Sequence, residues 1–241
     1  MGQVGHITGL SSQEQLFLGL AEQLARPLLT LTQLAELASG DDPATAAARW
    51  QLVQAIADSS LQLVESYALS LRVHGNVLAL NLEPVTVSSL LYDTAHALQP
   101  FAKQYGVDLE LESGPRLQPI LADRAVLQSA MTSLGQVFVL AQAESEEPAA
   151  VRLAAHRSRY GVVAGLYGQM PHISVDSLRR AHALQGAARQ PLSRLVSGPA
   201  AGVFVADSLL RTLAARLHVA RYRSLTGLAA TLQPSQQLQL V

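Results

Sequence analysis

Seven histidines are the side chains of this sequence best suited to acid–base or nucleophilic chemistry, because an imidazole titrates near neutrality, at about pH 6.5. They stand at positions 6, 74, 96, 156, 172, 182 and 218. His74 is the best placed, since it falls at the end of a predicted helix and close to a predicted hinge between domains. A cationic imidazole at a helix C-terminus is also stabilised by the helix dipole, and we favour that structural interpretation over a chemical role.

Metal and thiol chemistry have little support in the sequence. No pair of histidines has metal-ligand spacing backed by a carboxylate, and His172 with Asp176 four residues on is a weak signal. Cysteine is absent, which excludes disulfides, thiolate metal sites and a cysteine nucleophile. We expect no metal site and no cofactor.

The charge balance argues against a nucleic-acid-binding protein. The 241 residues hold 17 Lys and Arg against 18 Asp and Glu, which leaves no excess of cations to neutralise phosphates. Arginines do cluster in the second half, offset by Glu144, Glu146 and Glu147; they are Arg152, Arg157, Arg159, Arg179, Arg180, Arg189 and Arg194. We expect a solvated face there, with anion contact as the alternative.

A membrane or secreted location is not indicated. The start MGQVGHITGL lacks the basic flank and long apolar block of a signal peptide, and Glu22, Arg26 and Glu36 interrupt the longest apolar stretches. We expect a cytoplasmic protein without membrane contact.

Two helices are predicted for the first third of the chain, at 11–39 and 44–74, joined by a turn at 40–43. In both, apolar residues recur at alternating spacings of three and four, the pattern of a helical seam. The first seam comprises Phe17, Leu20, Leu24, Pro27, Leu31, Leu34 and Ala38, and the second Trp50, Val53, Ala57, Ser60, Val64, Tyr67 and Leu71. One hairpin is too thin to bury both stripes, so we expect two chains to form a homodimeric four-helix bundle.

Shorter elements follow and predict an α+β fold. Helices are expected at 87–105, from Asp123 and at 201–217, and strands at 107–111, 120–121, 149–155, 161–167 and 228–232. This order is typical of an α/β sandwich with helices on one face of a mostly antiparallel sheet. We place the dimerisation hairpin at 1–78 and the sandwich domain at 79–241.

Three stretches give this order of elements a family resemblance. They are LNLEPVTVSSLLYDTAHALQPFAKQYGVDLELE (80–112), ADRAVLQSAMTSLGQ (122–136) and SGPAAGVFVADSLLRTLAARL (197–217). The chain resembles the catalytic core of sensor histidine kinases, in which a dimerising, phosphate-accepting hairpin precedes an ATPase domain of the Hsp90 type. It also resembles the histidine phosphotransferases that share this architecture.

The resemblance implies that the residues of phosphate chemistry have been replaced. Aligned through Pro27, Glu22 occupies the phosphoacceptor position, and a carboxylate cannot form a phosphoramidate. The two asparagine positions of the family's Mg²⁺-binding helix fall on Ser133 and Val137, and valine cannot hold a metal. The adenine-reading segment falls on Gly168, Met170 and His172, and the last glycine-rich turn keeps Gly198 and Gly202 with Ala200 between them.

These replacements lead to a functional prediction. We expect a catalytically inactive, histidine-kinase-like homodimer that acts by binding in two-component signalling. The partner surface, for a response-regulator-like protein, is expected around Glu22, Ala25, Arg26 and Leu29. The alternatives are a divergent kinase or phosphotransferase using another histidine such as His74, and a structural dimeriser without a signalling role.

Overall fold

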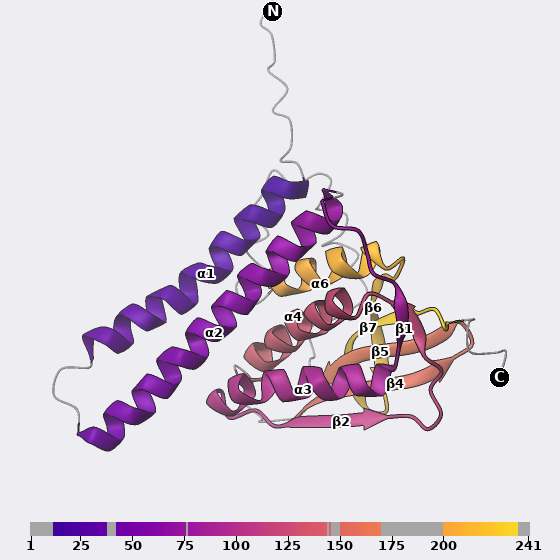
Figure 1. Ribbon diagram of the computed structural model, residues 1–241. Coiled ribbons are helices and arrows are strands. Elements are labelled where there is room, and N and C mark those ends of the chain that lie inside the picture. Colours follow the sequence, from indigo (N-terminus) through magenta and orange to yellow (C-terminus); the bar gives the residue numbers. More distant parts are fainter. Residues whose placement is uncertain are drawn as a thin grey trace, which may run out of the picture.

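The computed structural model describes residues 12–37, 42–75, 77–143, 145, 150–169 and 200–235. Helices α1 (Ser12–Glu36) and α2 (Pro43–His74) form an antiparallel hairpin (Figure 1). Asp42 caps α2 by accepting a hydrogen bond from the Thr45 backbone N–H at 3.2 Å, and hydrogen bonding from Thr45 lowers the pKa of Asp42. The hairpin predicted from the apolar spacing is therefore present in the structure.

The rest of the described chain is an α+β unit, as predicted. Its elements are β1 (Glu83–Val85), α3 (Val87–Gln104), β2 (Leu109–Ser113), β3 (Ile120–Ala122), α4 (Arg124–Ala143), β4 (Val151–Ser158), β5 (Gly161–Gly168), α6 (Ala200–Thr212), β6 (Leu217–Tyr222) and β7 (Leu225–Leu232). The five-stranded sheet has the order β2-β4-β5-β7-β6, in which only the β2–β4 pair is parallel. Strands β1 and β3 form a separate antiparallel pair.

Two strands were not predicted, the short β1 and the strand β6. The helix expected at 201–217 ends at Thr212, and Leu217 begins strand β6 instead. Ala214 has a φ of 55°, a left-handed conformation that stops the helix. The buried Asp207 then accepts a hydrogen bond from the Leu217 backbone N–H at 3.3 Å, which ties the start of β6 to α6.

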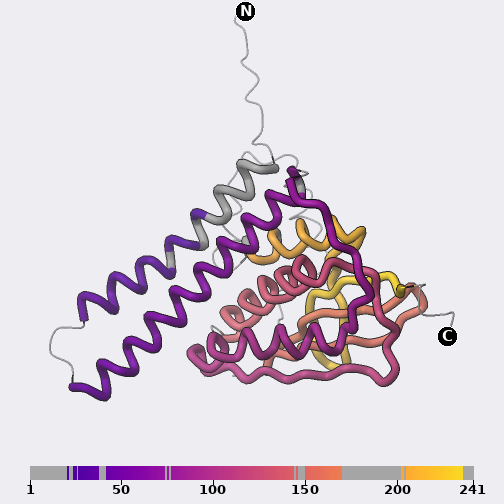
Figure 2. Tube along the Cα trace, viewed as in Figure 1, coloured from indigo at the N-terminus to yellow at the C-terminus, as the bar shows by residue number. Residues whose placement is uncertain are grey.

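The molecule has three layers, in the order hairpin, helices and sheet. Helices α3, α4 and α6 cover one face of the sheet, and α2 runs along the outer side of these helices (Figures 1 and 2). Tyr67 and Val73 of α2 belong to the same buried apolar cluster as Leu153 and Leu166 of the sheet. The domain boundary at 78/79 stays a prediction, and across it the hairpin and the sandwich share one core.

No helix in the described part of the chain combines the length and the apolar character needed to cross a bilayer.

The other face of the sheet carries a small aromatic cluster. Tyr167 is fully buried, and its ring centroid lies 5.3 Å from that of Tyr222, which in turn lies 5.6 Å from the ring of His156. Within the described part of the chain the Tyr167 hydroxyl has no hydrogen-bond partner, and burial raises the pKa of Tyr167 to about 12. Burial also lowers the pKa of His156.

The Tyr167 hydroxyl generates the first prediction. Between about pH 10 and pH 12 the unfolded chain loses this proton while the folded chain keeps it, so the free energy of unfolding falls as the pH rises. Tyr167→Phe should reduce this alkaline loss, measured by urea unfolding at pH 8 to 11.5. At pH 7 it should leave stability equal or higher, because an unpaired buried hydroxyl costs about 1–3 kcal/mol. Tyr92→Phe, at an exposed position, is the control, and an equal effect of both substitutions would contradict the prediction.

Candidate functional site

Three residues of the predicted degenerate nucleotide pocket meet between two helices. Ser133 and Val137 lie one turn apart on α4, Gly202 lies on α6, and all three are buried. Met170, His172 and Gly198 lie outside the described residues. Gly168 is the last residue of β5, where it pairs with Thr226 of β7.

Helices α4 and α6 are in direct contact at this point. A Cβ atom built on Gly202 would lie 2.6 Å from Val137 Cγ2 and 2.9 Å from the Ser133 carbonyl oxygen. Both distances are shorter than van der Waals contact, so only glycine permits this approach of the two helices. Helices α4 and α6 therefore pack directly against each other at Ser133, Val137 and Gly202.

Among the described residues of the predicted pocket, the one side-chain hydroxyl is already hydrogen-bonded and the other positions carry no polar side chain. The Ser133 hydroxyl donates to the Ser129 carbonyl oxygen within α4 at 2.9 Å. Val137 presents methyl groups where a metal ligand would need an oxygen, and Gly168 has no side chain with which to recognise a base. Of the predicted pocket residues that the structure describes, Val137, Gly168 and Gly202 supply no side-chain oxygen for a magnesium–nucleotide complex.

The predicted partner surface lies on α1. Ala25 is exposed and Leu29 is 63 % exposed, and their spacing of four residues places them on one helix face. Glu22 and Arg26 are also in α1, but their side chains lie outside the described part. The helix continues through Pro27, which is half-buried.

The seam predicted for α2 has two different environments. Near the start of the helix Trp50 is 72 % exposed, and at mid-helix Val64 is 36 % exposed. Leu61, which the seam did not include, precedes Val64 by three residues and is 58 % exposed. Tyr67, further along, is buried against the chain's own core. The exposed apolar residues of the hairpin comprise Leu28, Leu29, Leu37, Trp50, Leu61 and Val64.

A polar contact between hairpin and sandwich was not predicted. The Ser66 and Ser129 hydroxyls are 2.8 Å apart, and those of Ser70 and Ser208 are also 2.8 Å apart. The Gln136 amide nitrogen donates to Gln62 Oε1 at 3.2 Å. The four-residue spacing of Gln62, Ser66 and Ser70 on α2 is the signal that could have indicated this polar stripe.

The histidines do not gather into a site in the described part of the chain. His74 is the last residue of α2, and its side chain lies outside that part. His156 is half-buried on the outer sheet face, and its Nδ1 atom has no hydrogen-bond partner among the described residues. No group of three or more His, Cys, Asp or Glu side chains suited to a metal ion occurs among the described residues.

Comparison with known proteins identifies the fold. No protein-family model and no curated protein sequence matches this chain. Among solved structures it is similar to the Acinetobacter baumannii histidine kinase AdeS, at 13 % identity and a TM-score of 0.54 over 88 % of this chain and 97 % of that one.

Two further structures agree. Full-length ShkA in complex with AMPPNP has 18 % identity and a TM-score of 0.53, covering 93 % of this chain and 47 % of that one. The histidine kinase ThkA in complex with the response regulator TrrA has 10 % identity and a TM-score of 0.55, covering 91 % and 61 %. This chain has the fold of a sensor histidine kinase catalytic core.

The contact of α4 with α6 generates the second prediction. In a helix, alanine is favoured over glycine by about 1 kcal/mol. Gly202→Ala should nevertheless lower the free energy of unfolding by about 1–3 kcal/mol, because the added methyl meets Val137 and the Ser133 backbone. Urea unfolding measures the change.

A double-mutant cycle gives the control. Val137→Ala removes the nearer of the two contacts, so the cost of Gly202→Ala should be smaller in that background. If Gly202→Ala stabilised the protein as helix propensity alone predicts, the packed contact between the helices would be refuted.

Proposed function

We propose that this protein is a catalytically inactive, histidine-kinase-like homodimer that acts as a binding or regulatory module in cytoplasmic two-component signalling. The observation that carries the proposal is the direct contact of Gly202 with Val137 and Ser133. In the fold family this chain resembles, the corresponding helices hold a nucleotide and its metal, whereas here they pack against each other.

The loss of phosphate chemistry is supported at a second position. Glu22 aligns with the phosphoacceptor histidine and lies in α1. A carboxylate cannot form a phosphoramidate, so this helix cannot accept phosphate in the manner of a histidine kinase. Two separate parts of the chain thus lack the groups that the reaction requires.

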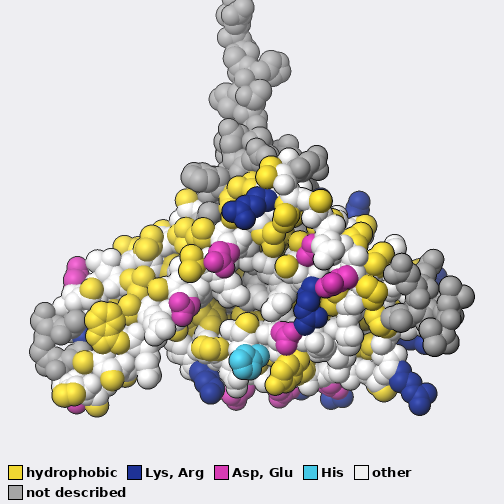
Figure 3. Space-filling view, viewed as in Figure 1, with side chains coloured by type: hydrophobic (Ala, Val, Ile, Leu, Met, Phe, Trp, Pro, Cys, Tyr) yellow, Lys and Arg dark blue, Asp and Glu magenta, His cyan; other side chains and the backbone are white. Residues whose placement is uncertain are grey.

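The proposal of a homodimer is supported by the apolar surface of the hairpin. Leu28, Trp50 and Leu61 are each more than half exposed. Figure 3 shows apolar side chains gathered over the hairpin on the face in view. Contiguous exposed apolar surface of this kind marks interaction sites, and a second copy of the hairpin would cover it.

The proposed partner is a response-regulator-like protein. ThkA, one of the structures similar to this chain, is in complex with the response regulator TrrA. In this chain Ala25 and Leu29 supply exposed apolar groups on α1, close in sequence to Glu22 and Arg26. Exposed apolar groups of this kind suit the buried centre of a specific protein contact.

Catalytic inactivity is tested with the wild-type chain, ATP and Mg²⁺. Because the space between α4 and α6 is filled, titration calorimetry should give no binding heat up to millimolar nucleotide. Labelled ATP, or a response regulator carrying aspartyl phosphate, should leave no acid-labile label on the chain. Label on a histidine that is lost in His74→Gln would instead establish the alternative, a phosphotransferase or divergent kinase.

The dimer and the partner surface are tested with two single variants. Leu61→Glu places a charge in the apolar surface of α2 and should convert a dimer into a monomer in sedimentation velocity. Leu29→Glu, on the predicted partner surface of α1, should weaken binding to a panel of purified receiver domains at least about tenfold, by more than about 1.4 kcal/mol.

A matched control separates the effect of charge from the effect of position. Gln51→Glu adds the same charge at an exposed α2 position that is already polar, so it should change neither the dimer nor the affinity for receiver domains. A monomeric wild type, or a panel that fails to bind it, would refute the corresponding part of the proposal.

A further inference from the structure

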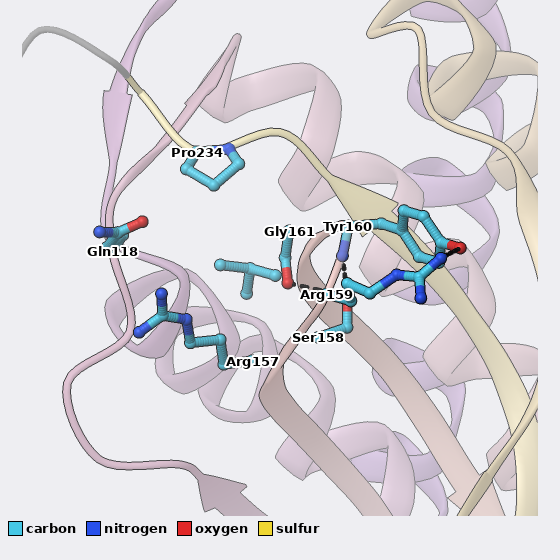
Figure 4. Close-up of a pocket in the computed structure, with 8 residues that line it drawn as sticks. Gln118, Arg157, Ser158, Arg159, Tyr160, Gly161 and Pro234 are labelled. Carbon is cyan, nitrogen blue, oxygen red and sulfur yellow. Dashed lines mark hydrogen bonds between the residues drawn. The ribbon is translucent and has the colours of Figure 1, made fainter.

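A pocket of about 240 Å³ opens at the turn between β4 and β5 (Figure 4). Arg157 and Gln118 stand on one side of it, Arg159 and Tyr160 on the other, and Pro234 lies above (Figure 4). The helical layer separates this end of the sheet from the hairpin (Figure 1). The pocket is therefore distinct from the proposed partner surface on α1.

The pocket has an unbalanced positive charge. Segments 113–119 and 156–161, which meet at this end of the sheet, contain Arg116, Arg157 and Arg159 and no Asp or Glu. Within the described part of the chain, neither Arg157 nor Arg159 forms an ion pair with a carboxylate. This exposed cationic group stands out because the whole chain has a net charge of −1.

Arginines elsewhere on the sheet are neutralised. Arg152 pairs with Glu110 and, at 3.7 Å, with Glu112, and Arg223 also pairs with Glu112. These groups balance one another on the outer sheet face. The arginines at the β4–β5 turn have no such partners among the described residues, so they can pair with carboxylates supplied by another molecule.

The turn that carries these arginines is held in one conformation. The Ser158 hydroxyl donates to the Gly161 carbonyl oxygen at 3.0 Å and accepts from the Tyr160 backbone N–H at 3.2 Å. Gly161 has a φ of 138°, and a Cβ there would lie 2.3 Å from the Leu232 carbonyl oxygen. The Arg159 guanidinium lies 4.8 Å from the Tyr160 ring centroid and donates to its hydroxyl. Because the turn is already ordered, the protein loses little conformational entropy when a partner binds, and this favours affinity.

The opposite wall is also fixed. The Leu121 backbone N–H donates to the Gln233 carbonyl oxygen at 3.3 Å, and that of Ser235 donates to the Pro119 carbonyl oxygen at 2.7 Å. These bonds join the loop that carries Gln118 to the segment that carries Pro234. The two walls of the pocket are thus set by backbone contacts.

We propose that this pocket is a docking site for an acidic segment of a partner protein. Its volume is below the range of about 300–1,000 Å³ typical of sites that enclose a small molecule, so it suits one or two side chains of a larger partner. Carboxylates of the segment pair with Arg157 and Arg159, from opposite sides, and its aliphatic parts lie on Pro234. Charge complementarity of this kind steers association and orients the partner.

The test uses the full chain and a fluorescent peptide of alternating Glu and Gly, followed by anisotropy at low and physiological salt. The double variant Arg157→Gln with Arg159→Gln should weaken binding at least about tenfold. The control variant, Arg72→Gln with Arg221→Gln, removes the same charge from exposed positions on α2 and β6 and should change affinity less than about threefold. Thermal unfolding checks that both variants stay folded.

Three results would overturn the proposal. One is absence of wild-type binding at millimolar peptide, and another is an equal loss of affinity in the control variant. The third is displacement of the peptide by inorganic phosphate or by single-stranded DNA of equal charge. The displacement counts only at concentrations where sodium chloride of the same ionic strength leaves the peptide bound. That result would assign the pocket to small oxyanions or to polyanions in general.

Discussion

The burial of α4 on nearly all sides is the constraint on which the rest of the structure depends. Thirteen of its residues are buried, and each neighbour meets a different part of its surface. On the α3 side, Gly135 lies so close to Leu98 that a Cβ would meet it at 2.1 Å, and on the α6 side Gly202 is the residue that allows contact. On the α2 side, Ser129 and Gln136 form hydrogen bonds. A helix enclosed in this way fixes the positions of both the hairpin and the sheet.

The same constraint bears on function. A nucleotide between α4 and α6 would have to separate Gly202 from Val137, and its own contacts would have to replace the apolar packing that this separation breaks. Val137 offers no oxygen for a metal, and the Ser133 hydroxyl is already bonded within its own helix. Opening this interface therefore carries the cost of disrupted packing without compensating ligand bonds. In the function proposed above, this packing would form part of a rigid scaffold that presents binding surfaces.

Much of the fold could be predicted from local signals. The start of α2 follows from Asp42 and Pro43, and that of α4 from Asp123, whose carboxylate accepts from the Val126 backbone N–H at 3.1 Å. Strand β6 could not be predicted, because the Ala- and Leu-rich segment before it continues a helical pattern until Ala214 takes a positive φ. That choice depends on the bond from the Leu217 N–H to Asp207, a contact across ten residues.

The sequence could indicate that Ser133, Val137 and Gly202 lie near one another, but not the geometry of their contact. The resemblance placed Ser133, Val137 and Gly202 in one pocket. Only the structure reveals that α4 and α6 pack directly against each other there. The pairs Ser66–Ser129 and Ser70–Ser208 were missed because serine in a helix usually faces solvent, and its partner lies 63 or 138 residues away. Sequence spacing describes one helix, whereas these contacts depend on how two helices meet.

The two halves of the α2 seam illustrate the same limit with a functional consequence. Spacing alone predicts the same environment for Val64 and Tyr67. In the structure, Tyr67 packs into the chain's own core, whereas Val64 is exposed. Trp50 and Leu61 are exposed as well. One helix therefore has two environments: its later part packs against the sandwich, and its earlier part carries the exposed apolar residues on which the proposed dimer rests. Because α2 is a continuous helix fastened to α4 and α6 through Ser66 and Ser70, a partner bound to the hairpin would act on a part that is rigidly joined to the sheet. Any change in the tilt of the hairpin must then either move the sandwich with it or break those hydroxyl pairs.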